Sequence, residues 1–211
     1  MDLNLVRLIL TPDVLPATGL APLVNGSGVA FEAALQACCC VRPQPSCSGC
    51  STRDGCGFAA LTARKLSDDI ELVRRHQRPS LPFVFERCAA VSSEIGLTLL
   101  GPACQEIPLF LKAVVHLLGE GGGWSVRALD YQGTPFVIAP TSQQGLDSVP
   151  VLSAYELLHQ HQQEFLGCNR VSLNLQSPLR LMQQGRELNR FLPDQFIRTL
   201  LRRLSSLTAY Y

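Results

Sequence analysis

Hydrophobic residues come in short runs along the first two thirds of the chain, and the runs predict the secondary structure. Residues 3–10 are rich in branched apolar side chains and stop at a Thr-Pro turn, which is typical of a buried strand. Residues 26–28 give a flexible entry to a helix. That helix has a small-residue face suited to close packing on a sheet, made of Ala30, Ala33, Ala34 and Ala37.

The next block, which follows a cysteine-rich loop, predicts two strands, a helix and a hairpin: residues 81–88, 94–102, 107–119 and 125–138. Pro108 stands where the helix begins and Gly119 where it ends. The hairpin turns at Gln132 and Gly133. From residue 3 to residue 138 the order is strand, helix, strand, strand, helix, strand, which is the split βαβ or ferredoxin-like arrangement.

The last third of the chain predicts the start of a second unit of the same kind. Residues 170–182 are predicted to form a strand with a Ser-Pro break, and residues 192–211 an amphipathic helix. We therefore expect an α+β fold in three parts: a ferredoxin-like domain over residues 1–140, a Gln- and Ser-rich connector over 141–168 with one amphipathic piece at 153–166, and a partial second ferredoxin-like unit over 169–211.

Half a ferredoxin-like unit cannot close its own sheet, so the apolar face of the final helix needs a cover. That face is made of Phe196, Leu200, Leu204 and Leu207. We expect either self-association or a stable protein partner to supply the cover.

Composition narrows the possible partners. The chain has 211 residues, 46% of them hydrophobic and 17% charged, which excludes a disordered protein. The formal net charge of +1 gives no overall attraction to nucleic acid, so RNA binding would need a local patch. Lys65 and Lys112 are the two lysines, and the other cations are arginines, whose planar fork suits phosphate. A GC-rich genome would give the same bias.

The N-terminal apolar run is too short for a signal peptide or for the roughly 18 residues of a membrane span. We therefore expect a soluble, cytoplasmic protein, in which thiols stay reduced.

Six of the nine cysteines lie in residues 38–58. Cys47 and Cys50 form a Cys-x-x-Cys turn, which can present two sulfurs to one tetrahedral ion, and Cys40 and Cys56 can complete the set. Structural zinc is the usual outcome for four thiolates in a reducing compartment, and it would fold a loop that has no core of its own. An iron–sulfur cluster and unliganded thiols are the alternatives, and Cys38 and Cys39 are competing ligands. The isolated Cys88, Cys104 and Cys168 are expected to be small core residues.

Seven stretches, taken together and in order, carry a family resemblance: NGSGVAFEAALQACC, CSGCSTRDGCGF, RPSLPFVFE, IGLTLLGPA, PLFLKAVVHLLGEGGGW, VSLNLQSPLRLMQQGRELN and LLRRLSSLTAYY. The chain resembles the CRISPR repeat-processing endoribonucleases of the RAMP superfamily, the Cas proteins of antiviral defence that cut precursor CRISPR RNA. The resemblance implies tandem ferredoxin-like, RRM-like domains that hold RNA on basic surfaces and cleave it without metal. It also implies that the cysteine loop is a structural insertion.

Two departures from the family bear on cleavage. Val29 and Ala33 occupy helix positions where members often carry arginine and histidine, and nothing after Tyr211 supplies the family's C-terminal glycine-rich segment. We therefore expect weak cleavage of repeat RNA or none.

Such cleavage needs a general base and a general acid. Of the four histidines, His76 is the best candidate, because three arginines lie within two residues of it. Phosphate contacts are expected from arginines and from a glycine loop whose amides are open to approach: Arg74, Arg75, Arg127, Arg180, Arg186, Arg190, Gly121, Gly122 and Gly123.

Three hypotheses follow for the function. The first is a precursor CRISPR RNA endoribonuclease or a truncated descendant of one, and the second is a non-catalytic CRISPR-RNA-binding subunit that works with other Cas subunits. The third is a zinc-stapled protein-interaction module. Salt-dependent binding to a repeat hairpin is expected for the first two and not for the third.

Overall fold

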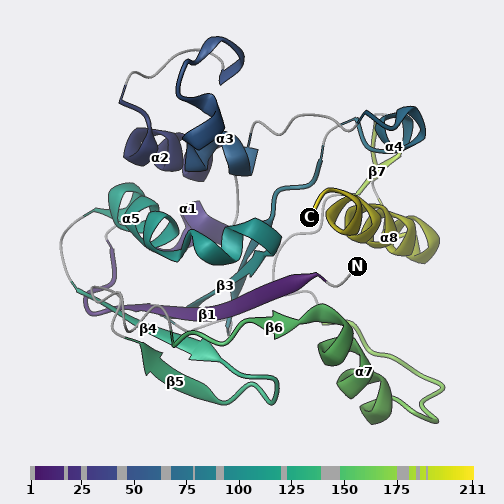
Figure 1. Cartoon of the computed structure of the whole chain (residues 1–211). Coiled ribbons are helices and arrows are strands. Elements are labelled where there is room, and N and C mark those ends of the chain that lie inside the picture. Colours follow the sequence, from purple (N-terminus) through teal and green to yellow (C-terminus); the bar gives the residue numbers. More distant parts are fainter. Residues whose placement is uncertain are drawn as a thin grey trace.

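The computed structural model in Figure 1 has an α+β architecture in which helices lie over an antiparallel sheet. It describes residues 3–16, 19–24, 28–41, 47–62, 68–77, 79–88, 93–119, 123–138, 148–174, 181–183, 186–188 and 190–211. Within these residues, no helix combines the length and the apolar character that crossing a bilayer requires.

The main sheet has the strand order β2-β3-β1-β4-β5, with every neighbouring pair antiparallel. These strands are β1 (Asn4–Pro12), β2 (Phe83–Arg87), β3 (Ile95–Leu100), β4 (Trp124–Leu129) and β5 (Pro135–Ile138). The central β1 places Leu8 opposite Leu97 of β3 and Ala128 of β4. A two-residue strand, β6 (Leu152–Ser153), pairs with the beginning of β1.

Two twelve-residue helices cover one face of this sheet, α2 (Gly28–Cys39) and α5 (Ile107–Leu118). Phe31 of α2 stacks on Phe110 of α5 with their ring centroids 5.8 Å apart, and both rings meet Phe83 of β2 edge-on. Alternate residues of the central strands fill the space beneath these rings, so the main core lies between this helix pair and the sheet.

The ferredoxin-like arrangement expected from the sequence is confirmed. The order β1, α2, β2, β3, α5, β4 is the expected sequence of elements, and β5 extends the sheet as the second arm of the predicted hairpin. Gly133 has a φ of 78° at the turn of that hairpin, a backbone conformation that glycine adopts readily. Gly119 ends α5 with a φ of 96°.

Short elements join these parts: α1 (Ala21–Val24), η1 (Cys47–Gly49), η2 (Arg53–Gly55), α3 (Gly57–Thr62), α4 (Ile70–Arg75) and η3 (Gly101–Gln105). After α2, the cysteine loop runs through η1 and η2 to the beginning of α3. Helix α4 lies on the other side of the molecule, beside the C-terminal helix (Figure 1).

The C-terminal part contains α7 (Ala154–Glu164), the short hairpin β7 (Met182–Gln183) and β8 (Arg186–Glu187), and the long helix α8 (Pro193–Tyr210). The amphipathic piece expected at 153–166 and the helix expected at 192–211 are both present. The strand expected over residues 170–182 is wrong for 170–174, which are exposed and form no strand, and its residues 175–180 lie outside the described residues.

A second, smaller core fixes α8 to the rest of the protein. Leu207 packs with Leu3 and Leu5 of the N-terminal segment, with Leu100 and with Leu152. The end of α8 therefore packs against the ferredoxin-like domain, and this apolar cluster contains residues from the N-terminal and the C-terminal part of the chain.

Candidate functional site

The short helix α4 presents two cations at its C-terminal end. The side chain of Asp69 caps its first turn by accepting hydrogen bonds from the backbone N–H groups of Glu71 (2.9 Å) and Leu72 (3.3 Å). Arg74 and Arg75 lie in the last turn, where positive charge is favoured by the helix dipole. Local sequence therefore explains both the helix and the position of its arginines.

Hydrogen bonds join α8 to the segment that follows α4. The hydroxyl of Ser206 accepts from the backbone N–H of Ser80 at 2.9 Å, and the hydroxyl of Tyr211 donates to the carbonyl of the same Ser80 at 2.9 Å. Tyr210 donates to the carbonyl of His76 at 3.3 Å. Ser206 is only 2% exposed, so the bond to its hydroxyl is largely shielded from water, and the three part-buried bonds together hold the two segments in one arrangement.

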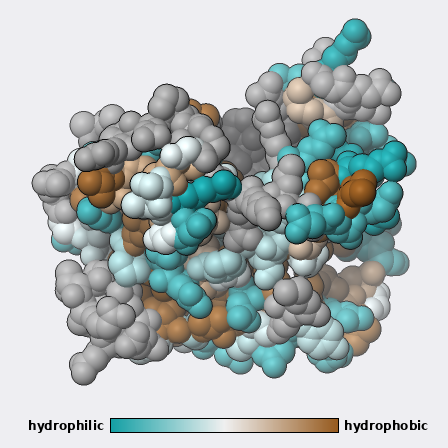
Figure 2. Space-filling model, turned by 45° about the horizontal axis from the view of Figure 1, so that its top comes forward, coloured by the Kyte–Doolittle hydropathy of each residue, from teal (hydrophilic) through white to brown (hydrophobic). Residues whose placement is uncertain are grey.

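A polar groove of about 610 Å³ lies between these two segments. Its described lining residues are Arg74, Arg75, His76, Gln77, Ser80, Thr199, Arg202, Arg203 and Ser206. Apart from His76, the ionisable side chains in this described set are all arginines. The right-hand side of Figure 2, where α4 and α8 lie, is mostly hydrophilic, with a small hydrophobic patch among the polar residues.

The groove arginines differ in their surroundings. Arg74 also pairs with Glu71 at 3.3 Å, but both side chains are largely exposed, so the pair is weak. Arg203 donates to the carbonyl of Phe83 at 3.3 Å, and partial burial of its guanidinium lowers its pKa, although the residue as a whole is exposed. An arginine keeps its charge throughout the physiological pH range. The groove is therefore positive at neutral pH.

His76, the histidine expected to take part in cleavage, lies in the wall of the groove. It is only 6% exposed, and its Nε2 lies 3.1 Å from the hydroxyl of Ser205. Its backbone N–H closes α4 by donating to the carbonyl of Leu72. Through these contacts His76 joins α4 to α8.

Two other residues expected to contact phosphate lie against acidic side chains. Arg127 on β4 forms an ion pair with Glu94, away from the groove. Gly123 lies against Asp13, whose backbone N–H donates to the Gly123 carbonyl at 2.9 Å and whose carboxylate fills the space that a side chain at Gly123 would need. A carboxylate at this position repels phosphate.

Two of the remaining expected residues do not line the groove, and three cannot be placed. Arg186 and Arg190 are exposed, and neither is among the described residues that line it. Gly121, Gly122 and Arg180 lie outside the described residues.

Sequence reasoning overlooked the α8 wall of the groove. Its residues are Thr199, Arg202, Arg203 and Ser206, which recur at helical spacing and so share one side of the helix. This spacing could have identified a polar strip on α8. It could not have identified α4 as the partner, because the two segments are more than a hundred residues apart in the sequence.

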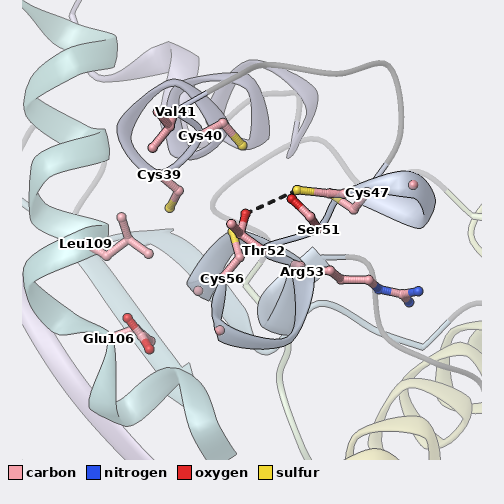
Figure 3. A pocket seen from close by; sticks show the side chains of 15 residues that line it. Cys39, Cys40, Val41, Cys47, Ser51, Thr52, Arg53, Cys56, Glu106 and Leu109 are labelled. Atoms are coloured by element: carbon pink, nitrogen blue, oxygen red, sulfur yellow. Dashed lines mark hydrogen bonds between the residues drawn. The ribbon is translucent and has the colours of Figure 1, made fainter.

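The cysteine loop encloses a separate cavity of about 630 Å³ (Figure 3). Cys40, Cys47, Cys50 and Cys56 all line it, together with Cys39. Successive backbone hydrogen bonds fold the segment: Cys50 donates to Cys47 at 3.3 Å, Arg53 to Cys50 at 3.3 Å, and Cys56 to Arg53 at 3.2 Å. The loop therefore brings all four expected ligands to one cavity.

The thiols of this cavity differ in acidity. Burial, followed by the neighbouring Cys56, raises the pKa of Cys39 to about 11. Burial also raises the pKa of Cys40, with further contributions from Cys56, Cys47 and Cys50. Hydrogen bonding to Thr52, whose hydroxyl oxygen lies 3.3 Å from the Cys50 sulfur, lowers the pKa of Cys50. Over the described part of the chain, no three Cys, His, Asp or Glu side chains form a ready-made metal-binding group.

The three isolated cysteines differ in their burial. Cys88 and Cys168 are exposed, so the expectation that they are core residues is wrong for both. Cys104 is partly buried and donates a weak hydrogen bond from its sulfur to the carbonyl of Leu99 at 3.6 Å.

Comparison with known proteins gives one match. A family model described as an N-terminal domain matches residues 25–129. No curated protein and no solved structure matches the chain. The matched segment runs from the beginning of α2 to the end of β4, so it includes the cysteine loop and the α4 wall of the groove. The α8 wall lies beyond it.

Proposed function

We propose that this protein binds RNA in the groove between α4 and α8, as a CRISPR-RNA-binding protein of the RAMP type. The observation that carries the proposal is the convergence of Arg74, Arg75, Arg202 and Arg203 on one groove. A protein with a net charge of only +1 needs such a local concentration of positive charge to hold a polyanion.

The chemistry of the lining suits a phosphate backbone better than a small anion or a protein surface. Guanidinium groups form two parallel hydrogen bonds to a phosphate, and the lining also includes the neutral polar residues Gln77, Ser80 and Thr199. Such contacts fix the position of the strand without recognising its sequence. The ferredoxin-like fold and the family resemblance of the sequence agree with RNA as the ligand.

Within this proposal, binding without cleavage is favoured over precursor processing. His76 is buried and already paired with Ser205, so it supports the groove wall and does not act as a base. The protein then acts as a non-catalytic subunit, in the reducing cytoplasm, beside other Cas subunits or a second copy of itself. Exposed Ile197, Leu200, Leu201 and Leu204 on α8 offer these partners an apolar surface.

The binding test compares two double variants of equal charge in the full-length protein. R75A/R202A removes one arginine from each wall of the groove, and the control K112A/R170A removes two exposed cations elsewhere. With a labelled repeat hairpin, the groove variant should bind about tenfold more weakly or worse, since a hydrogen bond to a charged group contributes roughly 1.5 kcal/mol or more. Its plot of log affinity against log salt should flatten by about 0.7–0.9 for each lost phosphate contact. Equal affinities of the two variants would contradict the proposal.

Cleavage is measured on the same hairpin in the presence of a metal chelator. The non-catalytic hypothesis predicts intact RNA. Cutting at a single site by the wild type that is lost in H76A would instead restore the endoribonuclease hypothesis. Light scattering of the same samples would report self-association, which the exposed apolar surface of α8 favours.

A further inference from the structure

We infer that Cys40, Cys47, Cys50 and Cys56 form one tetrahedral zinc site that closes the loop between α2 and α3. The inference is independent of RNA binding, because the cysteine cavity and the arginine groove share none of their described lining residues. It concerns the structural stability of the loop and assigns no catalytic chemistry to the metal.

The four sulfurs come from three consecutive pieces of the loop. Cys40 directly follows α2, Cys47 begins η1, Cys50 directly follows η1, and Cys56 directly precedes α3. Cys40 and Cys56 are close enough to share a side-chain hydrogen bond, so the two ends of the loop already meet. Figure 3 labels Cys40, Cys47 and Cys56 around the cavity, and Cys50 is also among its lining residues. Four thiolates around one space are a typical structural zinc site.

The structure also selects among the six cysteines of the loop. Cys39 is the remaining thiol of the cavity wall, but it lies within α2 and forms a hydrogen bond with the backbone of Phe58. Cys38 is not among the described residues that line the cavity. The two competing ligands expected from the sequence are therefore set aside in favour of the other four.

The sulfurs have to move closer together before four can meet at a single ion, because no three Cys, His, Asp or Glu side chains of the described residues form a metal-binding group. The sulfur of Cys50 is paired with the hydroxyl of Thr52, on an exposed part of the loop. Rotation about its Cα–Cβ bond would exchange this weak hydrogen bond for a zinc–sulfur bond of about 2.3 Å. Four thiol protons leave to solvent as the ion binds, which gives a site of charge −2, and Arg53 in the cavity wall offsets part of that charge.

The loop needs such a ligand because it has little core of its own. Within residues 47–56, none of the positions whose burial is described is buried, and the only regular structure is two 3-10 turns. The free energy of zinc binding is then available as folding free energy of the loop.

The test is metal analysis of full-length protein purified without chelators. We expect about one zinc per chain. C47S/C50S should lose the zinc, while C39S and C168S, which change thiols outside the ligand set, should keep it. T52V should also keep it, because it removes only the competing partner of Cys50. Replacement of zinc by cobalt should give the absorption bands of a tetrahedral thiolate site in the wild type and in C39S, C168S and T52V.

Removal of the metal should also lower the melting temperature of the wild type and leave that of C47S/C50S unchanged. Wild-type protein without zinc, an iron–sulfur chromophore, or a disulfide between Cys47 and Cys50 would each overturn the inference. The wild-type measurement decides the matter even where a variant fails to fold. RNA binding is measured in a separate experiment, so failure of the zinc proposal and failure of the RNA-binding proposal can be distinguished.

Discussion

The cysteine cavity and the arginine groove are similar in volume, but they are assembled in opposite ways. The cavity is local, since its four proposed ligands lie within residues 40–56. The groove joins α4 to α8, which are more than a hundred residues apart in the sequence. Spacing along the chain can therefore indicate the first site, whereas only the fold can reveal the second.

The two sites also differ in what holds their walls. The groove is closed by the hydrogen bond that the backbone N–H of Ser80 donates to the Ser206 hydroxyl and by the apolar packing of Leu207, so its arginines are placed before any ligand arrives. The cavity is bounded by short exposed turns, and its thiols still have other partners. We conclude that the groove is preorganised, whereas the zinc proposal predicts that the cavity gains order from its ligand.

The largest effect should come from removing the apolar anchor of the groove. L207A should destabilise the protein by about 2–4 kcal/mol, because Leu207 is only 6% exposed and its loss leaves a cavity in the smaller core. Urea unfolding measures this change. RNA binding should weaken as α8 loosens, while the zinc content stays at the wild-type value.

The matched control for this variant is L201A on the exposed side of the same helix. It should change stability by less than about 0.5 kcal/mol. If L207A and L201A behaved alike, α8 would not be anchored as described, and the groove would lose its claim to be preformed.

A smaller effect is expected from S206A. The backbone N–H of Ser80 would lose its acceptor in a buried position, which costs about 1–2 kcal/mol. T208A serves as the control, because the Thr208 hydroxyl is exposed and bonds only to carbonyls of its own helix. Chemical denaturation should give a clearly lower free energy of unfolding for S206A than for T208A. The reverse order would show that Ser206 is not one of the contacts that hold the groove.

The smallest effect concerns thiol reactivity in metal-free protein. Burial raises the pKa of Cys104 to about 11, so only about one molecule in a thousand carries its thiolate at pH 8. Hydrogen bonding to Thr52 lowers the pKa of Cys50. Mass spectrometry after iodoacetamide treatment at pH 8 should therefore find Cys50 modified well before Cys104. T52V should slow the modification of Cys50, and a rise in pH from 8 to 10 should speed that of Cys104.

The contrast between the two sites also explains how far the sequence could be interpreted. The ferredoxin-like order was predictable, because alternating and continuous apolar runs, with Pro108 and Gly119 at the helix ends, record local structure directly. The strand expected at 170–174 was wrong, since an apolar run shows only that a strand is possible and these residues have no neighbouring strand to pair with in the described structure.

The phosphate contacts show the same limit. Arg74 and Arg75 were identified from the cluster around His76, and they do line the groove. Arg127 was expected to contact phosphate, but it pairs with Glu94, which directly precedes β3 and is distant from Arg127 in the sequence. Arg202 and Arg203, which line the groove, were not among the phosphate contacts expected from the sequence. Which charges are paired and which converge is decided by tertiary packing, and spacing in the sequence does not record it.

The central claim is that RNA lies in the groove and not over the cysteine loop. It is tested most directly by ultraviolet crosslinking of the wild-type protein to a repeat hairpin, followed by mass spectrometry of the crosslinked peptides. The account predicts crosslinks in peptides that contain residues 74–80 and 199–206, and their loss in R75A/R202A. Crosslinks confined to residues 47–58, or an unchanged pattern in the double variant, would contradict it.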